Sequence, residues 1–429
     1  MSRSSDAGHF FQTSTALSES ARKAEKAKND FGAPIKLPSK LLAVAADPTD
    51  DAGVVYVAEA AGNVKRVVLE TGEVTHRFDG PAAPLTSIAI LPKARLLAAG
   101  CWDKSVWLWP LPAADTSTST SAAATTPSTA TPAASNKKAP AISSCGRLAG
   151  VHTDFVKTVI GASLGGTDVL VSGGSDAAIV VWDVEARAAL YKLTGHTRGV
   201  LALALDPAGY TTRLAKQAPA VTVLSAGSDR EVRAWRLEKT GGREVPVGGA
   251  AIEGEDEAAA SQDVKPLIRH DTSVDALWFD GDDDLWTASA DRSAKCLSRS
   301  RDYETDTTLS HPDFVRDVLV DEMGGWVVTA CRDEEVRVWE RASGKLHHTF
   351  SGHYEEVTGL LLLPGQRLVS VSIDGTVRQW SLKASDLKTA IEETERLKEG
   401  KPKESEEKKE IELDEDEERE LAELMEDDD

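Results

Sequence analysis

Two residue spacings recur along the chain, and together they constrain the fold more than any other feature. A histidine followed four residues later by a valine occurs at His152, His196, His270, His311 and His353. An aspartate followed six residues later by a tryptophan occurs at Asp103, Asp176, Asp229, Asp333 and Asp374. Units that recur about every forty residues are supersecondary structures that bury their faces only by packing on neighbouring copies.

The copy over residues 352–380 shows what one unit contains. Three apolar runs, 357–363, 368–372 and 377–380, are separated by a Pro-Gly turn at 364–365 and an Asp-Gly turn at 374–375. Short β-rich runs bounded by such turns predict consecutive antiparallel strands. The chain is therefore predicted to be all-β.

Glycine-histidine at 352–353, serine four residues before the aspartate, and Trp182-Asp183 together resemble the WD-repeat family of β-propellers. The resemblance covers about residues 40–382 and implies four-stranded blades closed into one ring. Blades three, four, six and seven carry the clearest copies. Blade one (41–78) lacks the signature residues, blade two (84–111) lacks the histidine, and blade five (270–309) has Leu297 in place of the tryptophan. We predict a single seven-bladed propeller, with six or eight blades as open alternatives.

The composition outside the repeats predicts the remaining organisation. We expect the outermost strand of the last blade to come from 34–38, because blade seven otherwise ends one strand short. An outer strand of blade two is expected over 142–148. Three parts are predicted. The first is a polar leader at 1–32, disordered or weakly helical, with a short helix over 18–28, and the second is the propeller at 33–382, with disordered insert loops at 112–140 and 239–262. The third, 383–429, is a helix over 385–398 followed by an acidic disordered tail.

Serine, histidine and aspartate recurring together also suggest a hydrolase, so that alternative has to be weighed. A nucleophilic triad needs one set of residues converging on a pocket, whereas here the set repeats and a tryptophan accompanies each copy. The resemblance implies structural tetrads instead, in which the aspartate accepts from the histidine, and the hydroxyl links histidine to indole. The predicted tetrads are His152, Ser172, Asp176 and Trp182; His196, Ser225, Asp229 and Trp235; His311, Thr329, Asp333 and Trp339; and His353, Ser370, Asp374 and Trp380.

No phosphate-binding G-x-x-x-x-G-K-[ST] loop and no H-E-x-x-H motif occurs in the sequence. We therefore predict no catalytic residue, no cofactor and no metal. The four cysteines have neither zinc-site nor disulfide-framework spacing, which favours reduced thiols and a cytoplasmic or nuclear location. No run of 18 apolar residues occurs, so no membrane span is expected.

The net charge is −21, and residues 386–429 alone hold 21 acidic and 8 basic residues. This balance opposes direct nucleic-acid binding by the propeller, which requires a basic surface. It favours protein partners, at least one of them basic, with the chain a monomer within a complex.

Propellers usually bind partners through the face built by the aspartate turns and the loops that carry the histidines. Aromatic and arginine side chains at these turns are the types enriched in interface hot spots. The predicted partner-binding face consists of Trp102, Phe155, Arg198, Arg230, Arg292, Phe314, Arg332 and Tyr354. Its arginines suit an acidic peptide or a phosphate group.

The function predicted from these features is a non-catalytic interaction scaffold that binds partners through the propeller face and the acidic tail. Two alternatives remain open: an accessory subunit of an RNA-handling complex, in ribosome assembly or tRNA modification, and a ubiquitin-ligase substrate receptor. Residues 332–338 resemble a stretch of the WD-repeat subunit of tRNA guanine-N7 methyltransferase. The Trp-Asp-x-Arg pattern of the ligase receptors is absent, because Val184 and Glu185 follow Trp182-Asp183.

Overall fold

The computed structural model describes residues 14–48, 53–112, 139–207, 220–248 and 264–398. The acidic tail and most of the insert loops predicted at 112–140 and 239–262 lie outside these residues. The described chain forms two compact units, residues 1–382 and 383–429, and each is treated by itself.

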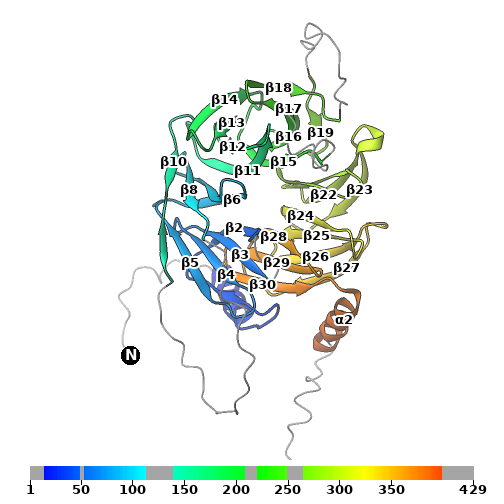
Figure 1. Ribbon diagram of the computed structural model, residues 1–429. Helices are drawn as coiled ribbons and strands as arrows, with labels where there is room; N and C mark the ends of the chain where they lie inside the picture. The colour runs from blue at the N-terminus through cyan, green and yellow to red at the C-terminus, as the bar shows by residue number, and fades with distance from the viewer. Residues whose placement is uncertain (1–13, 49–52, 113–138, 208–219, 249–263, 399–429) are drawn as a thin grey trace, which may run out of the picture. The chain divides into compact units, whose positions relative to one another are not determined.

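The first unit is a ring of seven sheets (Figure 1). The inner strand of each sheet is β2 (Leu41–Ala46), β6 (Leu85–Leu91), β11 (Val156–Leu164), β15 (Val200–Leu205), β20 (Val274–Phe279), β24 (Val315–Asp321) and β28 (Val357–Leu363). Every inner strand contacts the inner strands on both sides of it, and β2 contacts both β6 and β28. The ring is therefore closed, and the predicted seven-bladed propeller is confirmed.

The second strands are the most deeply buried elements. They are β3 (Val54–Glu59), β7 (Leu96–Cys101), β12 (Thr167–Gly174), β16 (Ala220–Gly227), β21 (Leu285–Ser289), β25 (Trp326–Cys331) and β29 (Arg367–Ser372). Neighbouring blades cover both faces of these strands, so their sequences are nearly continuous apolar runs, as in Val169–Val171.

The third strands are β4 (Val64–Val68), β8 (Val106–Pro110), β13 (Ala178–Asp183), β17 (Glu231–Glu238), β22 (Ser293–Ser298), β26 (Glu335–Glu340) and β30 (Thr376–Ser381). The outer strands are β5 (Val74–Asp79), β10 (Gly146–Leu148), β14 (Ala188–Thr194), β18 (Gly241–Val245), β23 (Glu304–Ser310), β27 (Leu346–Ser351) and β1 (Ile35–Lys36). The outer strands are less buried than the others, because one of their faces meets water, and β14 alternates between exposed and more buried side chains.

Every blade has an irregularity at the same place. The pairing between the first two strands skips one residue just after the first pair, as at Leu41/Ala43 in blade one and Val357/Gly359 in blade seven. The same bulge occurs in the five blades between them. Blade one, which carries none of the signature residues, is therefore a structural copy of the others.

The N-terminal segment closes the ring as predicted. Strand β1 pairs antiparallel with β30, with Ile35 opposite Val377 and Lys36 opposite Thr376. Backbone hydrogen bonds from Leu37 to Gly375 and from Gln379 to Gly32 extend this pairing on both sides. The last blade thus joins strands more than 300 residues apart in the chain.

Two predictions about outer strands need correction. The segment 142–148 is not one strand: β9 (Ala141–Ser143) pairs in parallel with β5 of blade one, and only β10 completes blade two. Within the predicted loop 239–262, residues 241–245 form strand β18, which pairs with β17. Strand β19 (Leu267–Ile268) pairs with another part of β17. In both places a short segment satisfies backbone groups of an otherwise open sheet edge.

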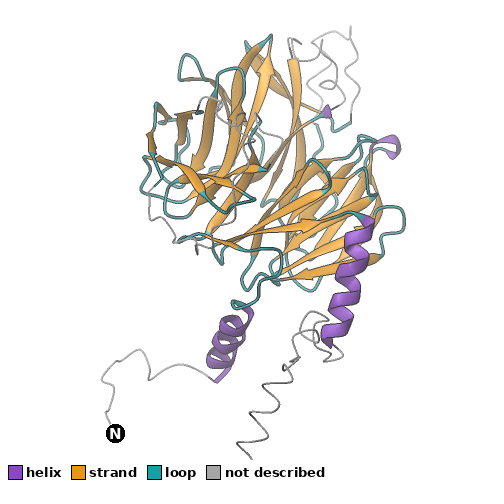
Figure 2. Cartoon of the chain, turned by 60° about the horizontal axis from the view of Figure 1, so that its bottom comes forward, coloured by secondary structure: helices purple, strands orange, loops and turns teal. Residues whose placement is uncertain are grey.

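Two α-helices occur in the described chain, besides a short 3-10 helix at Arg299–Arg301 (Figure 2). Helix α1 (Ser14–Lys26) begins four residues before the predicted start and ends two residues early. Helix α2 (Ala384–Lys398), in the second unit, matches the helix predicted over 385–398. Neither is long and apolar enough to cross a membrane.

Candidate functional site

The predicted tetrads form within single blades, and blade four shows the arrangement. The Nδ1 atom of His196 lies 2.9 Å from a carboxylate oxygen of Asp229, and its Nε2 atom lies 2.7 Å from Ser225 Oγ. The indole N–H of Trp235 donates to the same hydroxyl at 2.7 Å. One neutral tautomer satisfies the whole chain: Nδ1–H donates to the aspartate, and Nε2 accepts the serine proton. Blades three and seven have the same contacts.

Burial and hydrogen bonding explain the charge state of these groups. Burial lowers the pKa of His152 and His353, so both imidazoles are neutral near pH 7. Burial by itself raises the pKa of Asp229, but hydrogen bonds from His196 and from backbone amides outweigh it, and the pKa falls to about 2. The aspartates are therefore ionised acceptors.

Blade six departs from the predicted tetrad. Thr329 links His311 and Trp339 at 2.8 and 2.9 Å, but the His311 Nδ1–H donates to the backbone oxygen of Leu309 rather than to Asp333. The carboxylate of Asp333 instead accepts two hydrogen bonds from Arg337, at 3.0 and 2.6 Å.

The cause of this departure is visible in the sequence. In the other histidine-bearing blades the backbone N–H of the residue after the histidine donates to the aspartate, as Thr197 does to Asp229 at 2.9 Å. In blade six that residue is Pro312, which has no N–H. The bidentate guanidinium of Arg337 provides the missing donors. A proline after the histidine was the signal that the prediction missed.

Blades two and five, which have incomplete signatures, form only part of the tetrad hydrogen-bond set. In blade five, His270 contacts Asp291 at 2.8 Å and Thr287 at 2.7 Å, and Leu297 leaves the set without an indole donor, as expected. In blade two, Trp109 donates to the backbone oxygen of Asp79 in blade one. Asp103 there accepts from Trp107 at 2.9 Å.

This geometry does not form a hydrolase triad. Ser172, Ser225 and Ser370 are fully buried, each inside its own blade, and each hydroxyl is already bonded to a histidine and a tryptophan. A nucleophile must reach a substrate. The tetrads instead tie the aspartate turn to the second and third strands of the blade.

Blade six makes stability depend on pH in a defined direction. Burial and the nearby charge of Arg337 lower the pKa of His311 to about 4, against about 6.5 in an unfolded chain. Below pH 6.5 the unfolded chain binds a proton that the folded chain does not, so His311 lowers stability as the pH falls from about 6.5 to about 4, by about 3 kcal/mol in total. We expect His311→Gln to flatten the dependence of unfolding free energy on pH in this window, measured by urea unfolding. Equal slopes for the variant and the unchanged protein would contradict the assignment.

Two groups of described residues place three possible metal-ligating atoms within 4.8 Å of one another: His196, Asp229 and Glu231, and Asp280, Asp284 and Cys296. The first belongs to a tetrad. In the second, Asp280 accepts from Trp286 and pairs with Arg341 at 2.9 Å. Burial raises the pKa of Cys296 to about 12, which disfavours the thiolate that a metal requires. We assign neither group a metal.

The aspartate turns and the histidine loops lie on one side of the ring, which we call the turn face. Trp102 and Phe155 stack there with ring centroids 5.1 Å apart, although 39% and 37% of their surfaces remain exposed. The ammonium of Lys157 lies 5.2 Å from the Trp102 ring centre. The structure thus brings two predicted residues from neighbouring blades together and adds a lysine that the prediction missed.

The other predicted face residues fall into two groups. Arg198, Arg230 and Arg292 are exposed and make no ion pair or hydrogen bond through their side chains within the described part of the chain. By contrast, Arg332 stacks on Phe314, and the hydroxyl of Tyr354 donates to the backbone oxygen of Asp374 in the aspartate turn of the same blade.

A repeated backbone position shows how charge is divided over the turn face. The residue directly after each turn aspartate has a positive φ in blades two to seven. This residue is basic in blades two, four and five, acidic in blade six, and uncharged in blades three and seven. In order from blade two to blade seven, the residues are Lys104, Ala177, Arg230, Arg292, Glu334 and Gly375. This position is thus basic in blades two, four and five and acidic in blade six, and Glu355 in the histidine loop adds a carboxylate at blade seven. We call these the basic side and the acidic side of the turn face.

Helix α1 lies on the acidic side, and no sequence signal indicated this. Arg22 binds Glu334 with two hydrogen bonds, of 2.8 and 2.6 Å. Lys26 pairs with Glu334 and Glu335 at 3.0 and 2.9 Å. Lys23, next to Arg22, pairs with Glu355 of blade seven at 2.9 Å.

Comparison with known proteins agrees with this architecture. The family model described as "WD domain, G-beta repeat" matches residues 72–110, 188–236, 304–340 and 344–381. An uncharacterized WD repeat-containing protein of Schizosaccharomyces pombe is 30% identical over 390 residues, covering 88% of this chain and 89% of that protein. The chain belongs to the WD-repeat family.

Other WD-repeat proteins are less similar. WD repeat-containing protein 37 of Homo sapiens is 26% identical over 237 residues, covering 50% of this chain and 46% of that protein. Among solved structures, the WD40 β-propeller domain of Doa1 superposes with a TM-score of 0.59 at 18% identity, covering 83% of this chain and 98% of that one. This likeness shows the fold alone. WD-repeat propellers in general are non-catalytic scaffolds that bind other proteins.

Proposed function

We propose that this WD-repeat protein is a non-catalytic scaffold whose turn face binds an acidic segment of a partner protein over blades two to five. The observation that carries the proposal is the exposed Trp102–Phe155 stack, together with exposed arginines of blades four and five whose side chains form no ion pair among the described residues. Stacked aromatic side chains lose little entropy on binding and bury large areas. Tethering by Lys157 further restricts their motion before a partner arrives.

Charge supports the choice of an acidic partner. Lys104, Arg198, Arg230 and Arg292 present four cations along this side of the turn face, and all four side chains are exposed. A guanidinium without a partner can form two charge-assisted hydrogen bonds with one carboxylate or phosphate group. The turn aspartates beside these cations are largely buried and already accept hydrogen bonds within their blades, so the cations are the charges of these turns that a partner can reach.

The test compares partner capture by variants of the two faces. Proteins co-purifying with the full chain are identified by mass spectrometry, and their recovery is then measured with Trp102→Ala/Phe155→Ala and with Arg198→Glu/Arg230→Glu. We expect each double change to reduce recovery of the main partner at least about tenfold, as hot-spot losses of about 1.4 kcal/mol or more do.

Matched controls come from the opposite face. Met323 is 83% exposed in a turn between first and second strands, and Arg301 is exposed between third and outer strands. Met323→Ala and Arg301→Glu are expected to leave recovery unchanged. Equal recovery with the turn-face variants would refute the proposal.

A further inference from the structure

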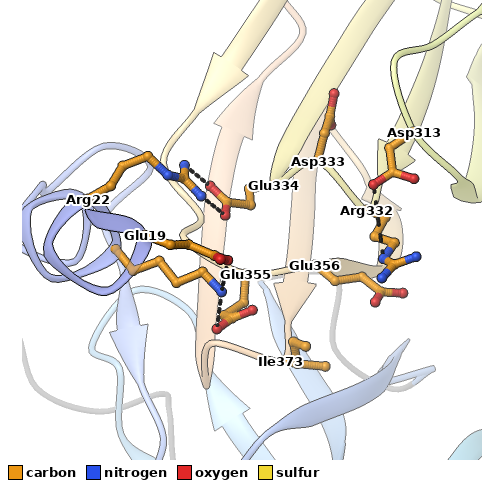
Figure 3. A pocket seen from close by; sticks show the side chains of 10 residues that line it. Glu19, Arg22, Asp313, Arg332, Asp333, Glu334, Glu355, Glu356 and Ile373 are labelled. Atoms are coloured by element: carbon orange, nitrogen blue, oxygen red, sulfur yellow. Dashed lines mark hydrogen bonds and ion pairs between the residues drawn. The ribbon is translucent and has the colours of Figure 1, made fainter. Parts of the chain in front are cut away.

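The acidic side of the turn face contains a cavity that α1 only partly fills. The cavity has a volume of about 490 Å³ between α1 and the loops of blades six and seven, and Figure 3 shows its lining. Six carboxylates and three cations face it: Glu19, Asp313, Asp333, Glu334, Glu355 and Glu356, with Arg22, Lys23 and Arg332. Carboxylates thus outnumber cations in the lining, and three of them also pair with cations outside it, namely Lys26, Arg316 and Arg337.

Only one wall of this cavity contacts α1. The helix reaches Glu334 and Glu355, whereas Asp313 and Glu356 on the other wall meet only cations of the propeller. Helix α1 also places its own Glu19 in the cavity, where Lys23 pairs with both Glu19 at 3.1 Å and Glu355 at 2.9 Å, so one cation is shared between two carboxylates. An occupant with a cation at that position would fit the charge of the cavity better.

The attachment of α1 is electrostatic and lacks a buried core. No side chain described between Leu17 and Lys26 is buried, and Leu17 is 53% exposed. A helix of 13 residues is marginal in water without packing. The cations of these pairs are between 21% and 53% exposed, and such pairs are weakened by salt, so the helix lacks the apolar packing that holds the strands.

The residues after α1 are held quite differently. Asn29 donates to the backbone oxygen of Gly352 at 3.0 Å and accepts from the buried Arg378 at 2.8 Å. Gly32 has a φ of 68° and lies against the Trp380 ring, where any Cβ atom would come within 3.0 Å. The chain is thus anchored at 29–32, and α1 can leave the surface without disturbing ring closure.

We propose that the acidic side of the turn face is a docking site for a basic helix of a partner protein, and that α1 is an intramolecular substitute for that helix. The partner would present cations at the spacing of Arg22, Lys23 and Lys26, which lie at i, i+1 and i+4 on one helix face. It would add a cation where α1 has Glu19. The carboxylates require a positive occupant, because Glu334 and Glu335 together would otherwise concentrate unpaired negative charge.

The experiment uses a fluorescent synthetic peptide of residues 14–28 and the full chain. In the Arg22→Glu/Lys26→Glu protein the chain's own helix is repelled and the site is open. Anisotropy titrations are expected to show peptide binding to this variant and at least tenfold weaker binding to the unchanged protein. Binding should weaken as sodium chloride is raised.

Variants of the site identify where the peptide binds. Adding Glu334→Gln/Glu335→Gln to the open variant is expected to abolish binding, whereas adding Glu304→Gln on outer strand β23 should not change it. Glutamine keeps the size of the side chain, and thermal unfolding verifies that each variant folds. Retained binding after the glutamine changes, or equal binding to the open variant and the unchanged protein, overturns the proposal, as does no binding to the open variant.

A gain of affinity tests the identity of the preferred occupant. The peptide with Glu19→Lys is expected to bind the open variant about threefold more tightly, since Glu19 no longer shares Lys23 with Glu355 and a cation is added beside the carboxylates of the lining. Equal or weaker binding of this peptide contradicts the inference that α1 is a suboptimal occupant. Trp102→Ala/Phe155→Ala should leave all these titrations unchanged, which separates this site from the one under Proposed function.

Discussion

Removing residues 1–39 is expected to destabilise the propeller by at least about 3 kcal/mol and to cause association through the open edge of β30. The deletion removes β1, the backbone hydrogen bonds of Leu37 and Gly32 to blade seven, and the packing of Ile35 against the core between blades seven and one. Each backbone hydrogen bond contributes about 1 kcal/mol. An unpaired strand edge also provides a template for intermolecular pairing.

The matched control is removal of residues 1–28, which takes away α1 and keeps the anchored segment and β1. Its contacts are ion pairs of exposed or half-buried cations, but they reach the buried Glu334, so the expected loss is about 1–2 kcal/mol, smaller than that for removal of β1. Urea unfolding followed by tryptophan fluorescence, with light scattering to detect association, distinguishes the two deletions. Equal unfolding midpoints would show that β1 does not close the ring in solution.

Thr329→Val is expected to destabilise the protein by about 3 kcal/mol although it changes the shape of the side chain very little. The Thr329 hydroxyl accepts from the indole of Trp339 and donates to Nε2 of His311, and Thr329 is fully buried. Valine leaves both partners without a hydrogen bond, and each unpaired buried group costs about 1–3 kcal/mol.

Thr329→Ser isolates the hydroxyl from the methyl group. Blades three, four and seven have serine at this position, so the fold accommodates it. We expect a loss of about 1 kcal/mol for the missing methyl group. Thermal and urea unfolding of both variants measure the difference. If serine and valine were equally destabilising, the tetrad hydroxyl would contribute nothing beyond packing.

The predicted hydrogen bond from His311 to Asp333 was wrong because of a proline next to the histidine in the sequence. The tetrad pattern specifies which residue types recur, but each hydrogen bond also depends on the backbone donors around it. Pro312 removes one donor, and the charged Arg337 replaces both that donor and the histidine. Reading side chains together with the prolines beside them would have found this difference.

The sequence by itself, with its resemblance to WD-repeat propellers, predicted a closed ring and the strand that joins its two ends, and favoured seven blades over six or eight; the structure decided that there are seven. Those features follow from strand periodicity, turn residues and hydrogen-bonding side chains that recur at fixed spacing, and each depends on contacts within about forty residues or on the need to pair a free sheet edge.

Only the tertiary structure decided which side chains from different blades meet. Helix α1 reaches Glu334 across a sequence separation of 312 residues, Trp102 meets Phe155 across an insert, and β9 joins blade one rather than blade two. No local pattern encodes these contacts, because they arise only when ring closure brings the loops of separate repeats onto one face. The division of the turn face into a basic and an acidic side is a property of the folded ring.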